Sequence, residues 1–180
     1  MKGKFALFLF LLLFAAPVWA QDQAAALAAG GCGPDKVKFD VKTDKKQHPT
    51  PQPEPGKALV YVVEVEKVDP GLSIDGLHTT TRIGLDGQWV GANHGKSYFF
   101  FPVDPGNHNL CANWQSSLGR YSKLASAVTL SAEAGQVYYF RTSVEEKSDR
   151  QPGLWLEALD PAEGQLQVGS SSFSTSHPKK

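Results

Sequence analysis

The sequence has no excess of positive charge and lacks the short motifs that mark common catalytic or metal sites. Its 180 residues contain 18 Lys and Arg against 18 Asp and Glu. Because cationic side chains supply most of the affinity for a phosphate backbone, nucleic-acid binding is not expected. No Gly-x-Ser-x-Gly elbow, His-x-x-x-His pair or Cys-x-x-Cys pair occurs. The usual sequence evidence for a serine hydrolase or a zinc centre is therefore missing.

Long apolar runs are also scarce, and the one that is present lies at the N-terminus. Residues 5–16 (FALFLFLLLFAA) follow Lys2 and Lys4 and precede Pro17 and a cleavage site after Ala20. This order is typical of a secretory signal peptide, and the run is too short to span a bilayer. We expect a periplasmic or secreted mature chain without a transmembrane segment, with outer-membrane association as an open alternative. Removing two lysines leaves 18 − 2 = 16 basic and 18 acidic residues, a charge of −2.

Cysteine is rare, with Cys32 and Cys111 as its two occurrences. In an exported protein we predict that they form a disulfide. Their 79-residue separation would give roughly 4 kcal/mol in the chain-entropy model. Because Cys111 alternates with Leu110 and Trp114, the bridge would fasten the N-terminal segment to the outer face of the strand at 108–114. Two free or intermolecular thiols, or a lipid on Cys32, are the alternatives.

Proline is concentrated ahead of the predicted core. The stretch 47–56 (QHPTPQPEPG), here called the Pro-rich strap, has a proline at every second position from 49 to 55. Such a segment favours an extended rod of roughly 25 Å at about 3.1 Å per residue, long enough to cross one face of a domain. The residues before it, 34–46, predict an edge strand or an ordered tether. The expected organisation is a signal peptide (1–20), an Ala-rich segment and Pro-rich strap (21–56), a β-sandwich domain (57–168) and a flexible tail (169–180).

The core region shows seven to eight short strand patterns separated by turn signals. Residues 58–66 (ALVYVVEVE) are β-branched and alternating, and Asp86-Gly87 is a favoured pair for a tight hairpin. Asp160, followed by Pro161 and Glu163, predicts a capped helix that runs to about Val168. The pattern predicts an all-β fold, an antiparallel β-sandwich of about seven to eight strands with a short C-terminal helix and an extended Pro-rich N-terminal segment.

The order of these strands and turns resembles a known family. It is carried by PGKALVYV (55–62), LDGQWVG (85–91), GKSYFFFPVDPGNHNL (95–110) and AGQVYYFR (134–141). The chain resembles the bacterial exported proteins grouped as domain of unknown function 2846, many of them lipoproteins, and more distantly PEGA-type modules of the prealbumin-like class. The resemblance implies an exported β-sandwich. It transfers no catalytic residue, because the family has no established activity.

The stretch GANHGKS (91–97) is close to a phosphate-binding loop, but two features argue against a nucleotide site. Gly91 and Gly95 enclose three residues where that loop needs four. The following Tyr98-Phe99-Phe100-Phe101 predicts a strand, whereas the loop must open a helix. We therefore predict a connector between two strands, with glycines for positive φ and no bound nucleotide.

Histidines and aromatic residues supply the remaining candidates. His78 and His94 lie in predicted loops and could hold a metal together with Asp75 or Asp86, although exposed loop histidines are the commoner case. His108 shares a face with Leu110, so we expect a packing role with a hydrogen bond to a turn carbonyl. Trp89, Trp155 and Tyr121 are the candidates for binding a glycan or peptide, since a flat apolar ring with a polar edge suits stacking.

The functional expectation is a non-enzymatic binding or structural module of the cell envelope, without a cofactor. The partner would be an envelope protein or a glycan. One alternative is a metal-dependent envelope hydrolase that uses the loop histidines. Another is an adaptor that pairs with a partner by strand addition at a sheet edge.

Overall fold

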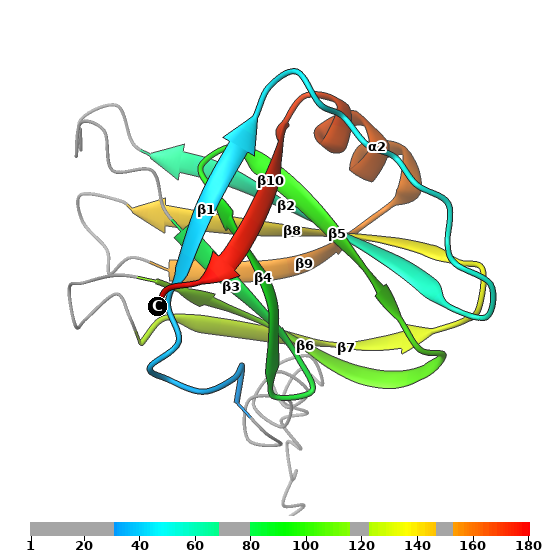
Figure 1. Cartoon of the computed structure of the whole chain (residues 1–180), viewed down its shortest axis with the longest axis horizontal. Coiled ribbons are helices and arrows are strands. Elements are labelled where there is room, and N and C mark those ends of the chain that lie inside the picture. The colour runs from blue at the N-terminus through cyan, green and yellow to red at the C-terminus, as the bar shows by residue number, and fades with distance from the viewer. Residues whose placement is uncertain (1–30, 69–79, 116–122, 147–152) are drawn as a thin grey trace, which may run out of the picture.

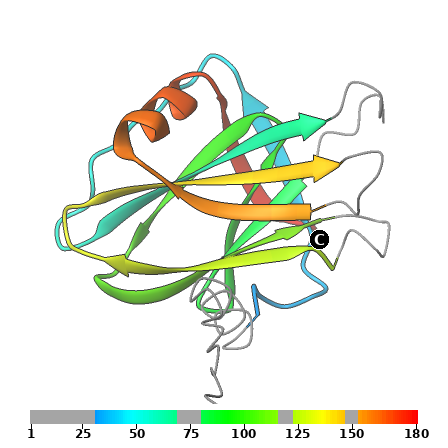
Figure 2. The same cartoon turned by 180° about the vertical axis from the view of Figure 1, so that it is seen from behind.

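The computed structural model describes residues 31–68, 80–115, 123–146 and 153–180, and within them two sheets pack face to face. The elements are β1 (Phe39–Asp44), β2 (Ala58–Val68), β3 (Thr80–Leu85), β4 (Gln88–His94), β5 (Ser97–Val103), β6 (Gly106–Trp114), β7 (Ala125–Ala132), β8 (Val137–Glu146), β9 (Gly153–Leu159), α2 (Pro161–Gly169) and β10 (Ser172–Pro178). The larger sheet has the order β1-β10-β5-β2-β8-β9 and the smaller β4-β3-β6-β7 (Figures 1 and 2). The expected all-β sandwich with a short C-terminal helix is confirmed.

The larger sheet differs from the expected pattern because it is mixed. Strand β2 lies parallel to β8 along ten residue pairs, from Leu59↔Val137 to Val68↔Glu146, and β10 lies parallel to the start of β5. The other strand pairs are antiparallel. Since β2 and β8 are far apart in the sequence, local turn signals could not reveal that they are neighbours.

The C-terminal residues correct the prediction of a flexible tail over 169–180. Residues 172–178 form β10, which pairs with β1 from Phe39↔Pro178 to Asp44↔Phe173. The segment 34–46, left open as a strand or a tether, contains the edge strand β1. Strands β1 and β10 therefore complete one side of the larger sheet, where they lie next to each other (Figure 1).

The serines of β10 explain how so polar a segment is held in place. Ser174 is 1% exposed, and its Oγ lies 2.9 Å from Asn93 Oδ1 and 3.2 Å from the Tyr98 carbonyl. The backbone N–H of Ala92 donates to Ser176 Oγ at 2.9 Å. The hydroxyls thus bond groups of β4 and β5, so the strand is stabilised by polar contacts that hydrophobic periodicity does not record.

The main core lies between the sheets and follows the predicted alternation. Leu110 and Ala112 of β6 are fully buried there and Trp114 packs beside them, whereas Cys111 points the other way. The central strand β2 contributes its even positions to this core. The buried members are Ala58, Val60, Val62, Ile83, Phe99, Phe101, Val103, Leu110, Ala112, Leu130, Ala132, Phe140, Leu154 and Leu156.

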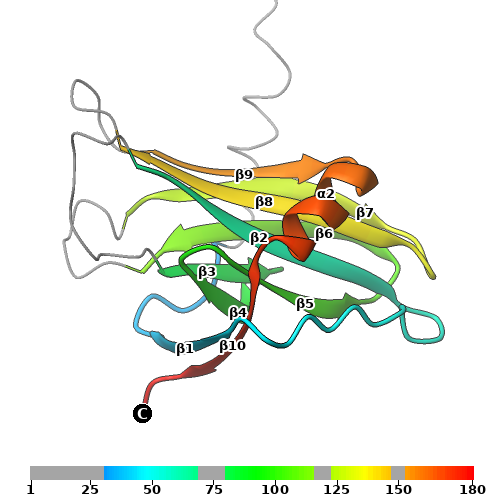
Figure 3. The ribbon, with the colours of Figure 1, turned by 90° about the horizontal axis from the view of Figure 1, so that it is seen from above.

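A second cluster covers the outer face of the larger sheet. Tyr61 and Tyr98 are buried there, and their hydroxyls donate to the carbonyls of Pro51 and Pro49 at 3.4 and 3.2 Å. Burial, with the neighbouring Tyr139 and Tyr98, raises the pKa of Tyr61 to about 12. Figures 1 and 3 show the Pro-rich strap passing beside α2 on its way from β1 to β2. The strap therefore crosses one face of the sandwich, as its composition predicted.

The predicted turns and cap are present. Asp86 and Gly87 have φ values of 51° and 80°, as a tight hairpin between β3 and β4 requires. Asp160 caps α2 by accepting from the N–H groups of Ala162 and Glu163, both at 3.0 Å. In GANHGKS, the residues up to His94 end β4, and Gly95-Lys96 connect it to β5 in the other sheet, with φ of 62° at Gly95. The stretch is a connector, as predicted.

Candidate functional site

The predicted cysteine pair is supported by the structure and fastens the N-terminal segment to the smaller sheet. The Cα atoms of Cys32 and Cys111 are 5.1 Å apart, within the range of a disulfide. Both residues are buried, at 8% and 3% exposure, in a small cluster with Ala127 on the outer face of β6 and β7. At Gly84 a Cβ would lie 1.8 Å from the Cys32 carbonyl oxygen, so only glycine allows the segment to approach this closely. A sulfur in this bond cannot also carry the alternative lipid.

Arg82 of β3 holds the same segment, and the sequence analysis missed it. Its guanidinium donates to Asn113 Oδ1 and to the carbonyl oxygens of Val37 and Asp35, and the side chain is almost fully buried. It also lies 4.4 Å from the centre of the Trp89 ring. Burial lowers the pKa of Arg82, against the opposing charge of Asp35. The sequence signal that could have identified Arg82 is strand alternation, because it precedes the core residue Ile83 and so faces the opposite side of the sheet. Its cross-strand neighbour there is Asn113.

Trp89, one of the candidates for binding a glycan or peptide, contacts the N-terminal segment. It is half-buried against the disulfide cluster, and its Nε1 donates to the Pro34 carbonyl at 3.0 Å. A Cβ at Gly33 would lie 2.7 Å from this ring, so the N-terminal segment runs directly over it. The structure therefore gives Trp89 a fastening role. A cavity of about 480 Å³ lies beside it, lined in part by Arg82 and Lys123.

We expect Trp89→Ala to lower the free energy of unfolding by about 2 kcal/mol, because it removes ring packing, the cation–π contact and a hydrogen bond together. Chemical denaturation of the purified protein measures this loss. Trp155→Ala is the matched control, and the same truncation there should cost less than about 1 kcal/mol because this residue is 44% exposed. Equal losses in the two variants would contradict the fastening role.

The other aromatic candidates are placed differently. Trp155 lies on the edge strand β9 and is exposed, with its ring over Gly153, where a Cβ would meet the ring at 2.0 Å. Tyr121 lies outside the described residues. Trp155 is thus the candidate whose ring is open to a partner.

The histidine candidates do not form a metal site in the described part of the chain. His94 Nδ1 lies 2.8 Å from Thr80 Oγ1, its cross-strand neighbour. Asp86, one of the two acids considered for this metal site, lies in the turn before β4, at the end of the strand opposite to His94, and it pairs with His108. His78 and Asp75 lie outside the described residues. Within the described residues, no group of three His, Cys, Asp or Glu side chains could hold a metal ion.

His108 has the packing role that its position predicted. Its Nδ1 lies 2.7 Å from Asp86 Oδ2 and its Nε2 lies 2.8 Å from the Asp104 carbonyl oxygen. Since both partners are acceptors, the doubly protonated cation fits best. Burial alone would lower the pKa of His108, but the hydrogen bonds and charges of Asp86 and Asp104 outweigh it, so the pKa is raised. Burial alone would raise the pKa of Asp86, but the hydrogen bond from the Asn109 N–H and the hydrogen bond and charge of His108 outweigh it. The pKa of Asp86 is therefore lowered.

These two shifts predict a pH window for the stability that the pair contributes. The raised pKa of His108 gives stability that is complete below about pH 6.5 and lost as the pH rises through the folded-state pKa. The lowered pKa of Asp86 gives stability that is complete above about pH 4 and lost on acidification. Unfolding free energies of the wild type and His108→Gln should therefore differ more at pH 5.5 than at pH 8.5. The difference stays below about 1 kcal/mol because Asp86 is half exposed, and a gap that widens at high pH would contradict it.

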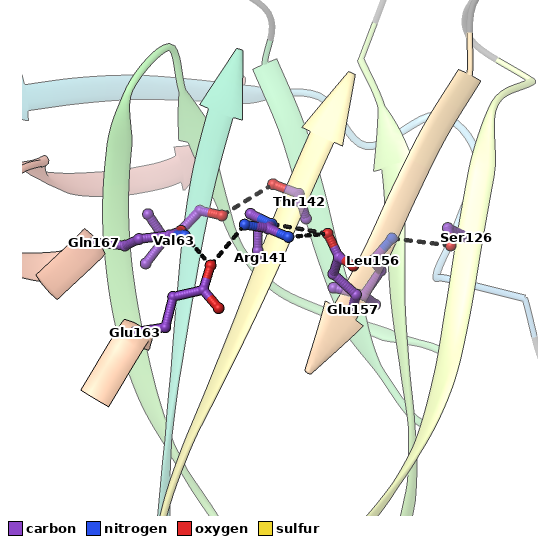
Figure 4. A network of polar contacts seen from close by, with 8 residues as sticks. All are labelled: Val63, Ser126, Arg141, Thr142, Leu156, Glu157, Glu163 and Gln167. Carbon is purple, nitrogen blue, oxygen red and sulfur yellow. Dashed lines mark hydrogen bonds and ion pairs between the residues drawn. The ribbon is translucent and has the colours of Figure 1, made fainter. Parts of the chain in front are cut away.

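A polar network fixes α2 on the larger sheet (Figure 4). Arg141 of β8 forms ion pairs with Glu157 of β9 at 2.6 Å and with Glu163 of α2 at 2.9 Å. Glu163 also accepts from Gln167 Nε2 at 2.8 Å. Gly164 faces the same sheet, and a Cβ there would lie 2.2 Å from the Tyr139 ring. The charged groups in this network are therefore engaged in holding the helix.

Comparison with known proteins gives one match. The family model described as "Protein of unknown function (DUF2846)" matches residues 54–153, more than half of the chain. The chain belongs to this family. In this DUF2846 member, the matched residues run from the end of the Pro-rich strap to the first residue of β9, so β1, α2 and β10 lie outside them. Neither the curated proteins nor the solved structures contain a match.

Proposed function

We propose that this DUF2846 protein works outside the cytosol as a non-enzymatic binding or structural module of the cell envelope. The observation that carries the proposal is the buried Cys32–Cys111 pair, because such bonds persist in oxidising compartments. The signal-peptide pattern of residues 1–20 agrees with it. Among the described residues, no helix is long and apolar enough to cross a bilayer.

The contacts of His108 and His94 are consistent with a role without catalysis. Both ring nitrogens of His108 are engaged with Asp86 and the Asp104 carbonyl, and His94 Nδ1 is engaged with Thr80. A catalytic base needs a lone pair directed at a substrate or a nucleophile. The rival, a metal-dependent hydrolase, is tested by metal analysis of the purified protein. A stoichiometric metal that is lost in the His78→Ala/His94→Ala variant would favour the rival.

Export, signal-peptide cleavage and disulfide formation can be measured together in a bacterial host that makes the chain with its own residues 1–20. We expect the protein in the periplasmic or secreted fraction, an N-terminus at Gln21, and an intact mass two hydrogens below that of the reduced form. Deleting residues 1–20 is the control and should retain the protein in the cytosol. A cytosolic wild type with both thiols free, or an acylated N-terminal Cys32, would contradict the proposal.

A glycan or peptide partner at Trp155 is a second candidate, favoured by its exposed ring on an edge strand. Addition of a whole partner strand there is opposed by one contact, since the Leu156 N–H already donates to Ser126 Oγ of the other sheet at 3.1 Å. Pull-down from native envelopes with the wild type and Trp155→Ala tests this role. Capture of the same partner at the same yield by both proteins would exclude Trp155 as the contact.

A further inference from the structure

Three segments that are distant in the sequence meet around a cavity of about 530 Å³. The end of β1 and the loop after it contribute Thr43, Lys45 and His48, and the β4–β5 connector contributes 94–96. The link from α2 to β10 contributes 169–172. In Figure 1, β1 ends where β10 begins, beside α2, so the two ends of the folded chain help to build this cavity.

The ionisable side chains that line the cavity are all basic. Lys45 and Lys96 line it, together with His48 and His94, and none of the described lining residues is Asp or Glu. Within the described part of the chain, neither lysine has a carboxylate partner. Asp44 precedes Lys45, but its Oδ1 accepts from the backbone N–H groups of residues 46 and 47. Two ammonium groups are thus available to an anion.

A buried hydroxyl is the second, independent observation. Ser171 lines the cavity and is 3% exposed, and its Oγ has no hydrogen-bond partner among the described residues. Its own backbone N–H donates to the Val168 carbonyl, and the neighbouring Ser170 hydroxyl is occupied by the Gln167 carbonyl. Leaving a buried hydroxyl unsatisfied is unfavourable, so a native structure that retains one calls for an explanation. A ligand oxygen in the cavity would supply the partner.

The geometry points to a site for a phosphate group carried by a small polar molecule or a lipid headgroup. We propose this ligand class because lysine ammonium groups and a hydroxyl donor suit an anion with several oxygens. The connector that fails as a nucleotide loop therefore contributes Gly95 and Lys96 to a different anion site. The inference rests on the proposed binding role and deepens it. Because it is tested on purified protein, its failure would not bear on export or on the Cys32–Cys111 disulfide.

The test is a titration of the purified full chain with inorganic phosphate, followed by calorimetry or by NMR shifts of the residues that line the cavity. We expect saturable binding in the millimolar range. The Lys45→Met/Lys96→Met variant should bind about tenfold more weakly, since two charged contacts are lost. Lys36→Met/Lys42→Met is the matched control with the same net charge, and its binding should stay within about twofold of the wild type. Equal weakening in both pairs, or no saturable binding by the wild type, would overturn the proposal.

Ser171→Ala separates a ligand-binding hydroxyl from a structural one. It should weaken phosphate binding several-fold while leaving the melting temperature of the free protein unchanged or higher, because it removes an unsatisfied buried group. Unchanged phosphate binding would overturn the role of Ser171 and, with it, the site. Vesicles with and without phosphatidic acid, and a soluble sugar phosphate, distinguish the two sources. If inorganic phosphate displaces the protein from the vesicles, or displaces the sugar phosphate from the protein, the site is supported. Binding of either probe that inorganic phosphate does not displace contradicts the site.

Discussion

Replacing both Cys32 and Cys111 with alanine is expected to lower the free energy of unfolding by about 4 kcal/mol. The bond closes a loop with a sequence separation of 79 residues, and the chain-entropy model assigns that loss to the freer unfolded chain. Since a single domain is stabilised by only about 5–15 kcal/mol, a large share of its stability would disappear. Denaturant unfolding of the wild type and the variant measures the difference.

Reduction supplies the control for this prediction. Wild-type protein that is reduced and alkylated should lose a similar amount of stability, and the double alanine variant should not respond to reductant. Limited proteolysis should then cut the N-terminal segment, residues 31–38, more readily in the variant. An alanine variant as stable as the oxidised wild type would show that the contacts of Arg82 and Trp89 alone hold the segment.

Ending the chain at Ser170 is expected to cost about 4 kcal/mol or to prevent folding. The truncation removes β10, which links β1 to β5, and exposes the surface covered by Phe173. It also leaves buried Asn93 without the Ser174 hydroxyl. Loss of one large apolar side chain is worth roughly 1.5–3 kcal/mol, and each buried group left unsatisfied adds about 1–3 kcal/mol. Circular dichroism and denaturant unfolding of the truncated chain measure the effect.

Point variants keep this prediction testable if the truncated chain does not fold. Ser174→Ala removes the hydroxyl that lies near Asn93 and the Tyr98 carbonyl, and should cost about 1–2 kcal/mol. Thr175→Ala changes the next residue of the same strand, which is exposed, and should cost less than about 0.5 kcal/mol. A flexible tail, in contrast, would tolerate the truncation and both substitutions without measurable loss.

Local patterns in the sequence were sufficient where one strand or turn decides its own structure. The alternation in β6 assigned Leu110 and Trp114 to the core and Cys111 to the opposite face. Asp86-Gly87 specified a tight turn because both positions need positive φ, and Asp160 specified the start of α2. Each signal concerns residues within one turn or strand, so it is present in the sequence before any tertiary contact forms.

Candidate sites were harder to predict because they depend on distant segments. Trp89 follows a hairpin turn, which suggests exposure, but the segment that the disulfide holds places Gly33 against its ring and the Pro34 carbonyl at its Nε1. The metal hypothesis joined His78 and His94 with Asp75 or Asp86, and β4 separates Asp86 from His94 by its full length. The phosphate cavity combines Lys45, Lys96 and Ser171 from three segments, and no spacing in the sequence marks that combination.

The sequence by itself determined the all-β class, the DUF2846 resemblance, the Pro-rich strap, the hairpin and the helix cap, because these rest on residue types and short spacings. Only the tertiary structure decided that β2 and β8 run parallel, that the polar C-terminal residues form β10, and that Ser171 lies buried at a cavity that two lysines also line. The physical reason is that strand partners and cavities arise from contacts across the whole chain. The polar groups of β10 and Ser171 gain their partners or their burial only after those contacts have formed.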